Sequence, residues 1–181
     1  SQLVAQMRIR DLDQLDKHII YALQGEARHT SSSDIAEQLD VSASTVRNRI
    51  QQLEADGVIR GYHADVDYER AGFQLFTLIV CTAPIPEREE LAERAVEISG
   101  VVEVQEVMTG ESNVLVRAVG ADGDDLSRIG EELDELGLKV TGEDIVRNTH
   151  RHPYHRFENG GTDDEGEESG SDTANDESSE E

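Results

Sequence analysis

The chain of 181 residues has one cysteine, no tryptophan, three prolines and only two lysines. A single cysteine excludes an internal disulfide and a cysteine-rich metal site. Because Cys81 ends an apolar run over residues 75–81, we expect a buried and inert thiol. No stretch approaches the roughly 18 apolar residues of a membrane helix, and no signal peptide is visible. We therefore expect a soluble, cytoplasmic protein.

Basic residues are also scarce. The 16 Lys and Arg face 40 Asp and Glu, which gives a formal net charge of −24. Residues 158–181 hold 11 of these acids, no Lys or Arg and almost no apolar side chain. Such a segment cannot bury enough surface to offset its conformational entropy, so we expect a disordered acidic tail.

The excess of acid over lysine is typical of proteins that work in molar salt, where screening falls to a few Å and carboxylates keep the surface hydrated. We expect a halophilic host, and an ordinary acidic protein with a solubilising tail is the alternative. A nucleic-acid-binding domain is normally basic. The N-terminal part is close to balance, because the residues up to Ala64 contain seven Arg and Lys against nine Asp and Glu.

Three helical patterns fill this N-terminal part. The first begins after Asp13, a favourable N-cap, and runs to about Gly25. The second opens within the serine run 31–33, and the third opens after Ser42. Residues 58–66 follow as an extended, hairpin-like connector.

The second and third helices have the spacing of a helix-turn-helix. Their inward positions are small or apolar: Ile35, Ala36 and Leu39 in the second helix, and Val46, Ile50 and Leu53 in the third. Between them, Asp40 lies where such a turn needs a left-handed backbone, which Asp tolerates better than most residues. We therefore expect a rigid pair of helices of the type that binds DNA.

The third helix carries a polar outer face. Its 100° step places Ser44, Asn48 and Gln51 outward, flanked by Thr45 and Arg47. Asn and Gln pair with adenine, Arg with guanine, and hydroxyls with phosphate. A plain helical hairpin would carry acids and lysines here, whereas residues 42–52 contain two Arg and no acid. We expect contacts with double-stranded DNA from Ser42, Ser44, Thr45, Arg47, Asn48, Arg49 and Gln51, with Arg49 as a phosphate contact or an internal ion pair.

Residues 73–150 follow a different pattern. Strands are expected over 73–83, 101–108, 114–119 and 138–149, with helices over 87–98 and 124–136. The order βαββαβ is ferredoxin-like, so the fold class is α+β. Helices cover one face of such a sheet only, and a second copy of the chain is the simplest cover for the other. We expect a homodimer or a higher oligomer.

The chain resembles the leucine-responsive regulatory protein/AsnC family, the feast/famine regulators of bacteria and archaea. The matching stretches are Leu12-Asp13 with Asp16, Ile19 and Leu23, then DIAEQL at 34–39, VSASTVRNRI at 41–50, LEADGVIRGY at 53–62 and Thr109-Gly110. The resemblance implies a winged helix-turn-helix DNA-binding domain over 8–62, a linker over 63–72, and a ferredoxin-like effector-binding and oligomerisation domain over 73–150. It also implies a transcriptional regulator whose oligomer reads a palindromic operator.

The resemblance further implies an amino-acid effector, bound near Thr109, Gly110, Glu111 and Asn113. Members that sense amino acids commonly carry Asp at the position of Asn113, where an acid suits an α-ammonium group. Asn113 removes that charge. Either Glu111 supplies it, or the effector is a different amino acid, or the regulator works without one. A tight turn around Gly110 is the structural alternative. No cofactor is expected.

Three other functions would each need features of their own in the sequence. His150, His152 and His155 form a histidine cluster that suits a transition metal, although Pro153 interrupts it and a basic strand extension is the preferred interpretation. An RNA-binding sheet would use exposed aromatics, of which Phe73 and Phe76 are the candidates. An enzyme would need a phosphate-binding glycine loop, a nucleophile with its base or a metal-carboxylate cluster, and none is visible. We therefore do not expect an enzyme.

Overall fold

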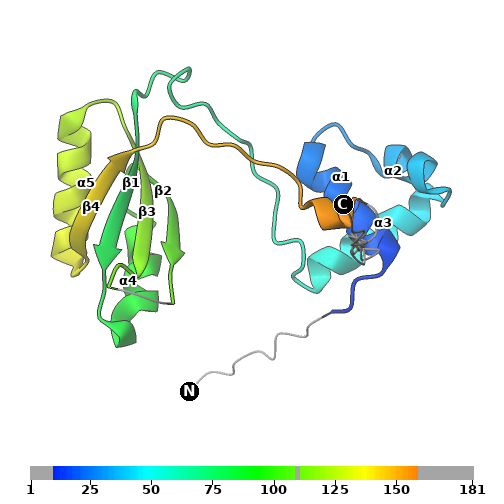
Figure 1. The fold of residues 1–181 in the computed structure, drawn as a ribbon, viewed down its shortest axis with the longest axis horizontal. Coiled ribbons are helices and arrows are strands. Elements are labelled where there is room, and N and C mark those ends of the chain that lie inside the picture. The colour runs from blue at the N-terminus through cyan, green and yellow to red at the C-terminus, as the bar shows by residue number, and fades with distance from the viewer. Residues whose placement is uncertain (1–9, 109–110, 159–181) are drawn as a thin grey trace, which may run out of the picture. The chain divides into compact units, whose positions relative to one another are not determined.

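A computed structural model of the chain describes residues 10–108 and 111–158. The described residues divide into two compact units, one formed by 10–62 with 152–158 and the other by 63–151. The first is helical and the second is a sheet with two long helices (Figure 1). The α+β class expected from the sequence is confirmed. The predicted disordered tail over 158–181 lies outside the described residues, apart from Glu158.

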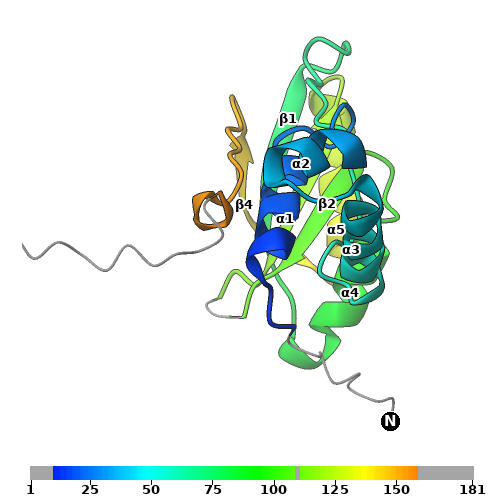
Figure 2. The same ribbon diagram turned by 90° about the vertical axis from the view of Figure 1, so that its right-hand side faces the viewer.

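The first unit contains the three expected helices: α1 (Gln14–Glu26), α2 (Ser32–Leu39) and α3 (Ala43–Ala55). Each begins after a residue whose side chain accepts a hydrogen bond from the backbone N–H three positions on. These N-caps are Asp13, Ser31 and Ser42. Figure 2 shows α2 and α3 crossing rather than lying side by side. The helix boundaries that the sequence predicted are therefore close to those of the structure.

The turn between α2 and α3 is set by Asp40. Its φ of 52° is left-handed, and it is the one non-glycine residue with positive φ among residues 10–108 and 111–158. The N–H of Val41 then donates to the carbonyl of Ala36 over 3.2 Å, which closes the end of α2. This geometry confirms the role expected for Asp40. It directs α3 across α2, so that Val46 and Leu53 meet Ile35 in one buried core.

The connector after α3 is extended but forms no hairpin. Within the described part of the chain, no strand is present between α3 and β1 (Leu75–Thr82). Val58, Tyr62 and Val66 are exposed along it. Tyr62 donates its hydroxyl to Glu54 Oε1 over 3.0 Å, and burial together with this bond raises the pKa of Tyr62 to about 12.

The second unit has the predicted βαββαβ order. It consists of β1, a 3₁₀ turn η1 (Ile85–Glu87), α4 (Arg88–Ala95), β2 (Val101–Glu106), β3 (Val114–Gly120), α5 (Gly123–Leu136) and β4 (Lys139–Ile145). All pairings are antiparallel and the strand order is β2-β3-β1-β4. This is the ferredoxin-like arrangement. Pro84 and Pro86 end β1, as the sequence predicted.

The two helices cover one face of this sheet. Ile79, Cys81 and Val116 point into a core that Leu91 and Ile129 close from the helices. Burial raises the pKa of the Cys81 thiol to about 11, which agrees with the inert thiol expected from the sequence. On the opposite face, Phe76, Leu78 and Val80 of β1 are only half-buried. This face has no covering helix in the described unit (Figure 1).

The segment after β4 differs from the expectation. The sequence predicted a strand to about Thr149 and a basic strand extension beyond it, but β4 ends at Ile145 and His155–Phe157 form a 3₁₀ turn, η2. This turn packs on α1 (Figure 1). Phe157 joins the core of the first unit, and its ring lies edge-on to Tyr154 with centroids 4.9 Å apart. Apolar contact with the helical unit therefore overrides the local strand pattern.

Ending the chain after Arg151 is expected to destabilise the helical unit by about 1–2 kcal/mol, because the half-buried Phe157 ring is lost from its core. Hydrogen exchange of the α1 amides measures this loss. Ending the chain after Glu158 instead removes only 159–181 and is the matched control, for which we expect unchanged exchange. Equal protection in both shortened chains would contradict a structural role for η2.

Within residues 10–108 and 111–158, no helix combines the length and apolarity needed to cross a membrane.

Candidate nucleic-acid interface

The outer face of α3 is polar and open. Because Val46 and Leu53 are fully buried, the opposite side of the helix is turned to solvent. The structure places there all five residues of the expected reading face, each exposed: Ser44, Thr45, Arg47, Asn48 and Gln51. Their amides, hydroxyls and guanidinium are groups that hydrogen-bond base edges and phosphates in a major groove.

Ser42, also expected at the interface, is engaged with the helix itself. Its Oγ accepts from Thr45 N–H at 3.1 Å and lies 2.9 Å from Ser44 Oγ and 2.7 Å from Thr45 Oγ1. Three hydroxyls thus gather at the first turn of α3, where the helix dipole is positive. The bonded Oγ explains why α3 begins directly after this residue.

The arginines on and near α3 differ in their partners. Arg10 and Arg49 are bound to carboxylates. For Arg47 on α3 and Arg60 beyond it, no ion pair is present within residues 10–108 and 111–158, and both are exposed. The guanidinium of Arg47, on a stretch without acids over residues 42–52, gives local positive charge in an otherwise strongly acidic chain.

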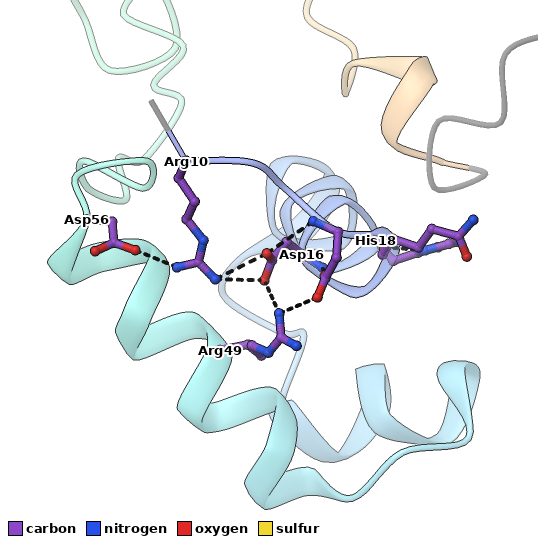
Figure 3. A network of polar contacts seen from close by, with 7 residues as sticks. Arg10, Asp16, His18, Arg49 and Asp56 are labelled. Atoms are coloured by element: carbon purple, nitrogen blue, oxygen red, sulfur yellow. Dashed lines mark hydrogen bonds and ion pairs between the residues drawn. The ribbon is translucent and has the colours of Figure 1, made fainter. Parts of the chain in front are cut away.

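Arg49 takes the internal ion pair that the sequence offered as an alternative to a phosphate contact. Its Nη1 donates to Asp13 Oδ2 over 2.6 Å and to Asp16 Oδ1 over 3.1 Å (Figure 3). Burial acts to raise the pKa of the Asp13 carboxyl, but the Asp16 N–H bond, the Arg49 bond and the charges of Arg49 and Arg10 hold that pKa below its usual range. Hydrogen bonding to Asp13 in turn raises the pKa of Arg49.

Asp16 is a residue whose importance sequence reasoning missed. In the sequence it stands only among the residues that carry the family resemblance, yet it is buried and bonded to both arginines. The signal was its position: Asp16 precedes the buried Ile19 and Ile20 by three and four residues and therefore shares their face of α1.

The expected effector loop is described in part. Thr109 and Gly110 lie outside the described residues. Asn113 is buried, and its side chain bonds both backbone groups of Ala83, accepting from the N–H and donating to the carbonyl at 2.8 Å each. Glu111 is exposed. Its backbone carbonyl, and not its carboxylate, accepts a hydrogen bond from the Thr82 hydroxyl. Asn113 thus joins the loop to the end of β1, and Glu111 is the acid of this loop that is open to solvent.

Neither a metal site nor an RNA-binding sheet surface is assembled in the described residues. Across 10–108 and 111–158, no group of three or more His, Cys, Asp or Glu is arranged to hold a metal ion, His150, His152 and His155 included. Phe73, expected on the first strand, precedes it. Phe76 packs against Tyr68 with ring centroids 5.5 Å apart. The sheet therefore does not present the two phenylalanines as a pair of stacking platforms.

Comparison with known proteins agrees with this geometry. Residues 12–60 match a family model described as winged helix-turn-helix DNA-binding. The chain is 31% identical over 135 residues to the HTH-type transcriptional regulator Ptr1 of Methanocaldococcus jannaschii, which covers 72% of this chain and 90% of the relative. An HTH-type transcriptional regulator of Pyrococcus abyssi is 34% identical over 136 residues, with 75% and 91% covered.

Solved structures share the whole two-unit fold. The leucine response regulatory protein LrpA of Mycobacterium tuberculosis superposes with a TM-score of 0.66 at 25% identity, over 79% of this chain and 100% of the other. A transcriptional regulator of Neisseria meningitidis, solved as a complex with L-Met, gives 0.64 at 26% identity over 79% and 94%. Together with the geometry of α2 and α3, these similarities show that the chain belongs to the leucine-responsive regulatory protein/AsnC family of DNA-binding transcriptional regulators.

Proposed function

We propose that this regulator binds a palindromic DNA site as a homo-oligomer, with one α3 in the major groove of each half-site. The observation that carries the proposal is the outer face of α3. It is exposed, contains no acid over residues 42–52 and includes Arg47, for which no ion pair is present among residues 10–108 and 111–158, in a chain whose formal net charge is −24. A two-fold oligomer presents two such faces, and a palindromic operator mirrors that symmetry.

Selection of bound fragments from a random DNA pool tests the proposal. We expect the enriched sequences to share two inverted half-sites whose centres lie about one helical turn, or a multiple of it, apart. The selection is run in molar KCl and again in dilute salt, because phosphate contacts weaken with salt whereas base contacts still discriminate. Enrichment of a single, non-repeated motif would contradict the symmetric arrangement.

The oligomer is proposed to form through the open face of the sheet. Phe76, Leu78 and Val80 alternate with the buried residues of β1 and leave an apolar surface that a second sheet can cover. Val58, Tyr62 and Val66 of the connector are further apolar side chains exposed to solvent. Burial of both surfaces against a second copy removes them from water and is favourable for that reason.

An amino-acid effector is proposed at the loop that contains Thr109, Gly110, Glu111 and Asn113. The L-Met bound to the Neisseria meningitidis regulator supports this ligand class. In this chain the side chain of Asn113 is already bonded to Ala83, so the exposed Glu111 is the acid we assign to the α-ammonium group. Binding at this loop would alter how dimers associate and hence which DNA arrangement is contacted.

Titration calorimetry against a panel of amino acids measures effector binding. We expect heat with at least one amino acid in the unchanged protein, and at least tenfold weaker binding in Glu111→Gln because a charge-assisted bond is lost. Glu97→Gln, which removes an exposed acid elsewhere in the same unit, is the control. Absence of heat with every amino acid would contradict the effector proposal and leave the DNA-binding proposal intact.

A further inference from the structure

Asp16 is a buried acid in the first turn of α1. Only 1% of the residue is exposed, and it occupies the third position of the helix, where Oδ2 also accepts the N–H of Asp13 at 3.4 Å. A carboxylate so removed from water is costly unless cations and hydrogen bonds compensate it. The groups that compensate the charge of Asp16 therefore indicate its role.

Two arginines compensate Asp16, and each also binds a second acid. Arg49, in the middle of α3, reaches Asp16 and Asp13. Arg10, just before α1, lies 3.2 Å from Asp16 Oδ2 and 2.6 Å from Asp56 Oδ2. Asp56 is the residue that ends α3. Through Asp16, α3 is thus joined to the start of α1 at two points along its length, as Figure 3 shows.

These contacts restrain α3 in a way that apolar packing does not. Hydrophobic contact is non-directional, so the packing of Val46 and Leu53 leaves small rotations and slides of α3 inexpensive. Charge-assisted hydrogen bonds have a preferred length and angle and fix both motions. Base reading needs the same precision, because a displaced helix loses bidentate pairing with base edges.

We propose that Asp16 is a positioning residue for sequence recognition: by holding Arg10 and Arg49, it fixes the placement of α3 and keeps both guanidinium groups from DNA phosphates. This inference rests on the proposed use of α3 as the reading helix. It assigns to Asp16 a function beyond capping α1, since a capping bond alone needs neither arginine.

Asp16→Asn tests the proposal, with Asp34→Asn as the matched control. Asp34 occupies the equivalent third position of α2 and bonds its N-cap Ser31, but it is exposed, and no arginine among residues 10–108 and 111–158 pairs with it. Both substitutions remove one negative charge. Affinities for the selected operator and for a scrambled duplex of equal length are measured over a series of KCl concentrations, after circular dichroism has confirmed folding.

For Asp34→Asn, we expect the ratio of operator to scrambled affinity to be unchanged. For Asp16→Asn, we expect the ratio to fall at least tenfold, while scrambled DNA binds more tightly and with a steeper salt dependence, because Arg10 and Arg49 become available to phosphates. A merely structural role would weaken both duplexes together and would not steepen the salt dependence.

If Asp16→Asn does not fold, Arg10→Gln carries the test, with Arg28→Gln as its control for lost positive charge. Arg28 is exposed in the same unit, and no ion pair joins it within the described residues. We expect a lower ratio for Arg10→Gln only. An unchanged ratio in a folded Asp16→Asn protein, or an equal loss for both duplexes, would overturn the inference. Failure of the proposed function is recognised separately, because the unchanged protein would then not distinguish operator from scrambled DNA.

Discussion

A chain carrying both Arg47→Ala and Asn48→Ala is expected to bind its operator about a thousandfold more weakly than the unchanged protein. Each bidentate contact to a base contributes about 1–3 kcal/mol of discrimination, and two residues on each of two reading helices are lost. Even at the lower limit this amounts to about 4 kcal/mol, close to three decades in affinity. Fluorescence anisotropy with labelled operator, in salt that supports folding, measures the loss.

The oligomeric state and the thermal stability are expected to remain unchanged in this double variant. Both side chains are exposed and neither has a bonding partner within residues 10–108 and 111–158. Arg28→Ala with Gln38→Ala is the matched control, because it removes the same charge and the same kind of amide from exposed positions off α3. Unchanged operator affinity in the Arg47/Asn48 variant would show that another surface reads the DNA.

Asn113→Ala is expected to destabilise the ferredoxin-like unit by about 3 kcal/mol, because it leaves the N–H and the carbonyl of Ala83 without partners in a buried place. Two unmade bonds to the end of β1 release the strand from the loop before β3. The helical unit is expected to keep its stability, since the residue lies wholly within the other unit.

The only cysteine provides a specific measurement of this effect. Cys81 is fully buried in the core of the sheet unit, so its reaction with a thiol reagent across a urea series reports the opening of that unit alone. We expect Asn113→Ala to react at clearly lower urea concentrations than the unchanged protein. Ser112→Ala, next to it in the same loop, is the control and should react as the unchanged chain does. An Asn113→Ala chain that matched this control would exclude the bonding role.

Local sequence patterns determined most of the fold. Caps at Asp13 and Ser42, and the left-handed turn at Asp40, could be predicted directly, because each depends on the chemistry of one side chain and its nearest neighbours. For the second helix, the serine run 31–33 gave the start to within two residues. Strands and helices of the second unit followed from the period of the apolar residues for the same reason. The outer face of α3 likewise follows from the 100° step once its inward residues are known.

Long-range contacts account for what the sequence alone did not determine. The bonding of Asp16 could not be predicted, because its partners Arg49 and Arg10 lie 33 and 6 residues away and meet it only in the folded unit. From the sequence, Asn113 was only a position that lacks the acid expected to bind an effector. In the structure its amide bonds the backbone of Ala83, 30 residues earlier. The segment after β4 was predicted to be extended, but in the structure Phe157 packs into the core of the helical unit. The sequence by itself therefore determined the helices, the strands and the exposed outer face of α3, because their causes are local. Only the tertiary structure decided which polar side chains form bonds within the protein, because their partners are distant in the chain.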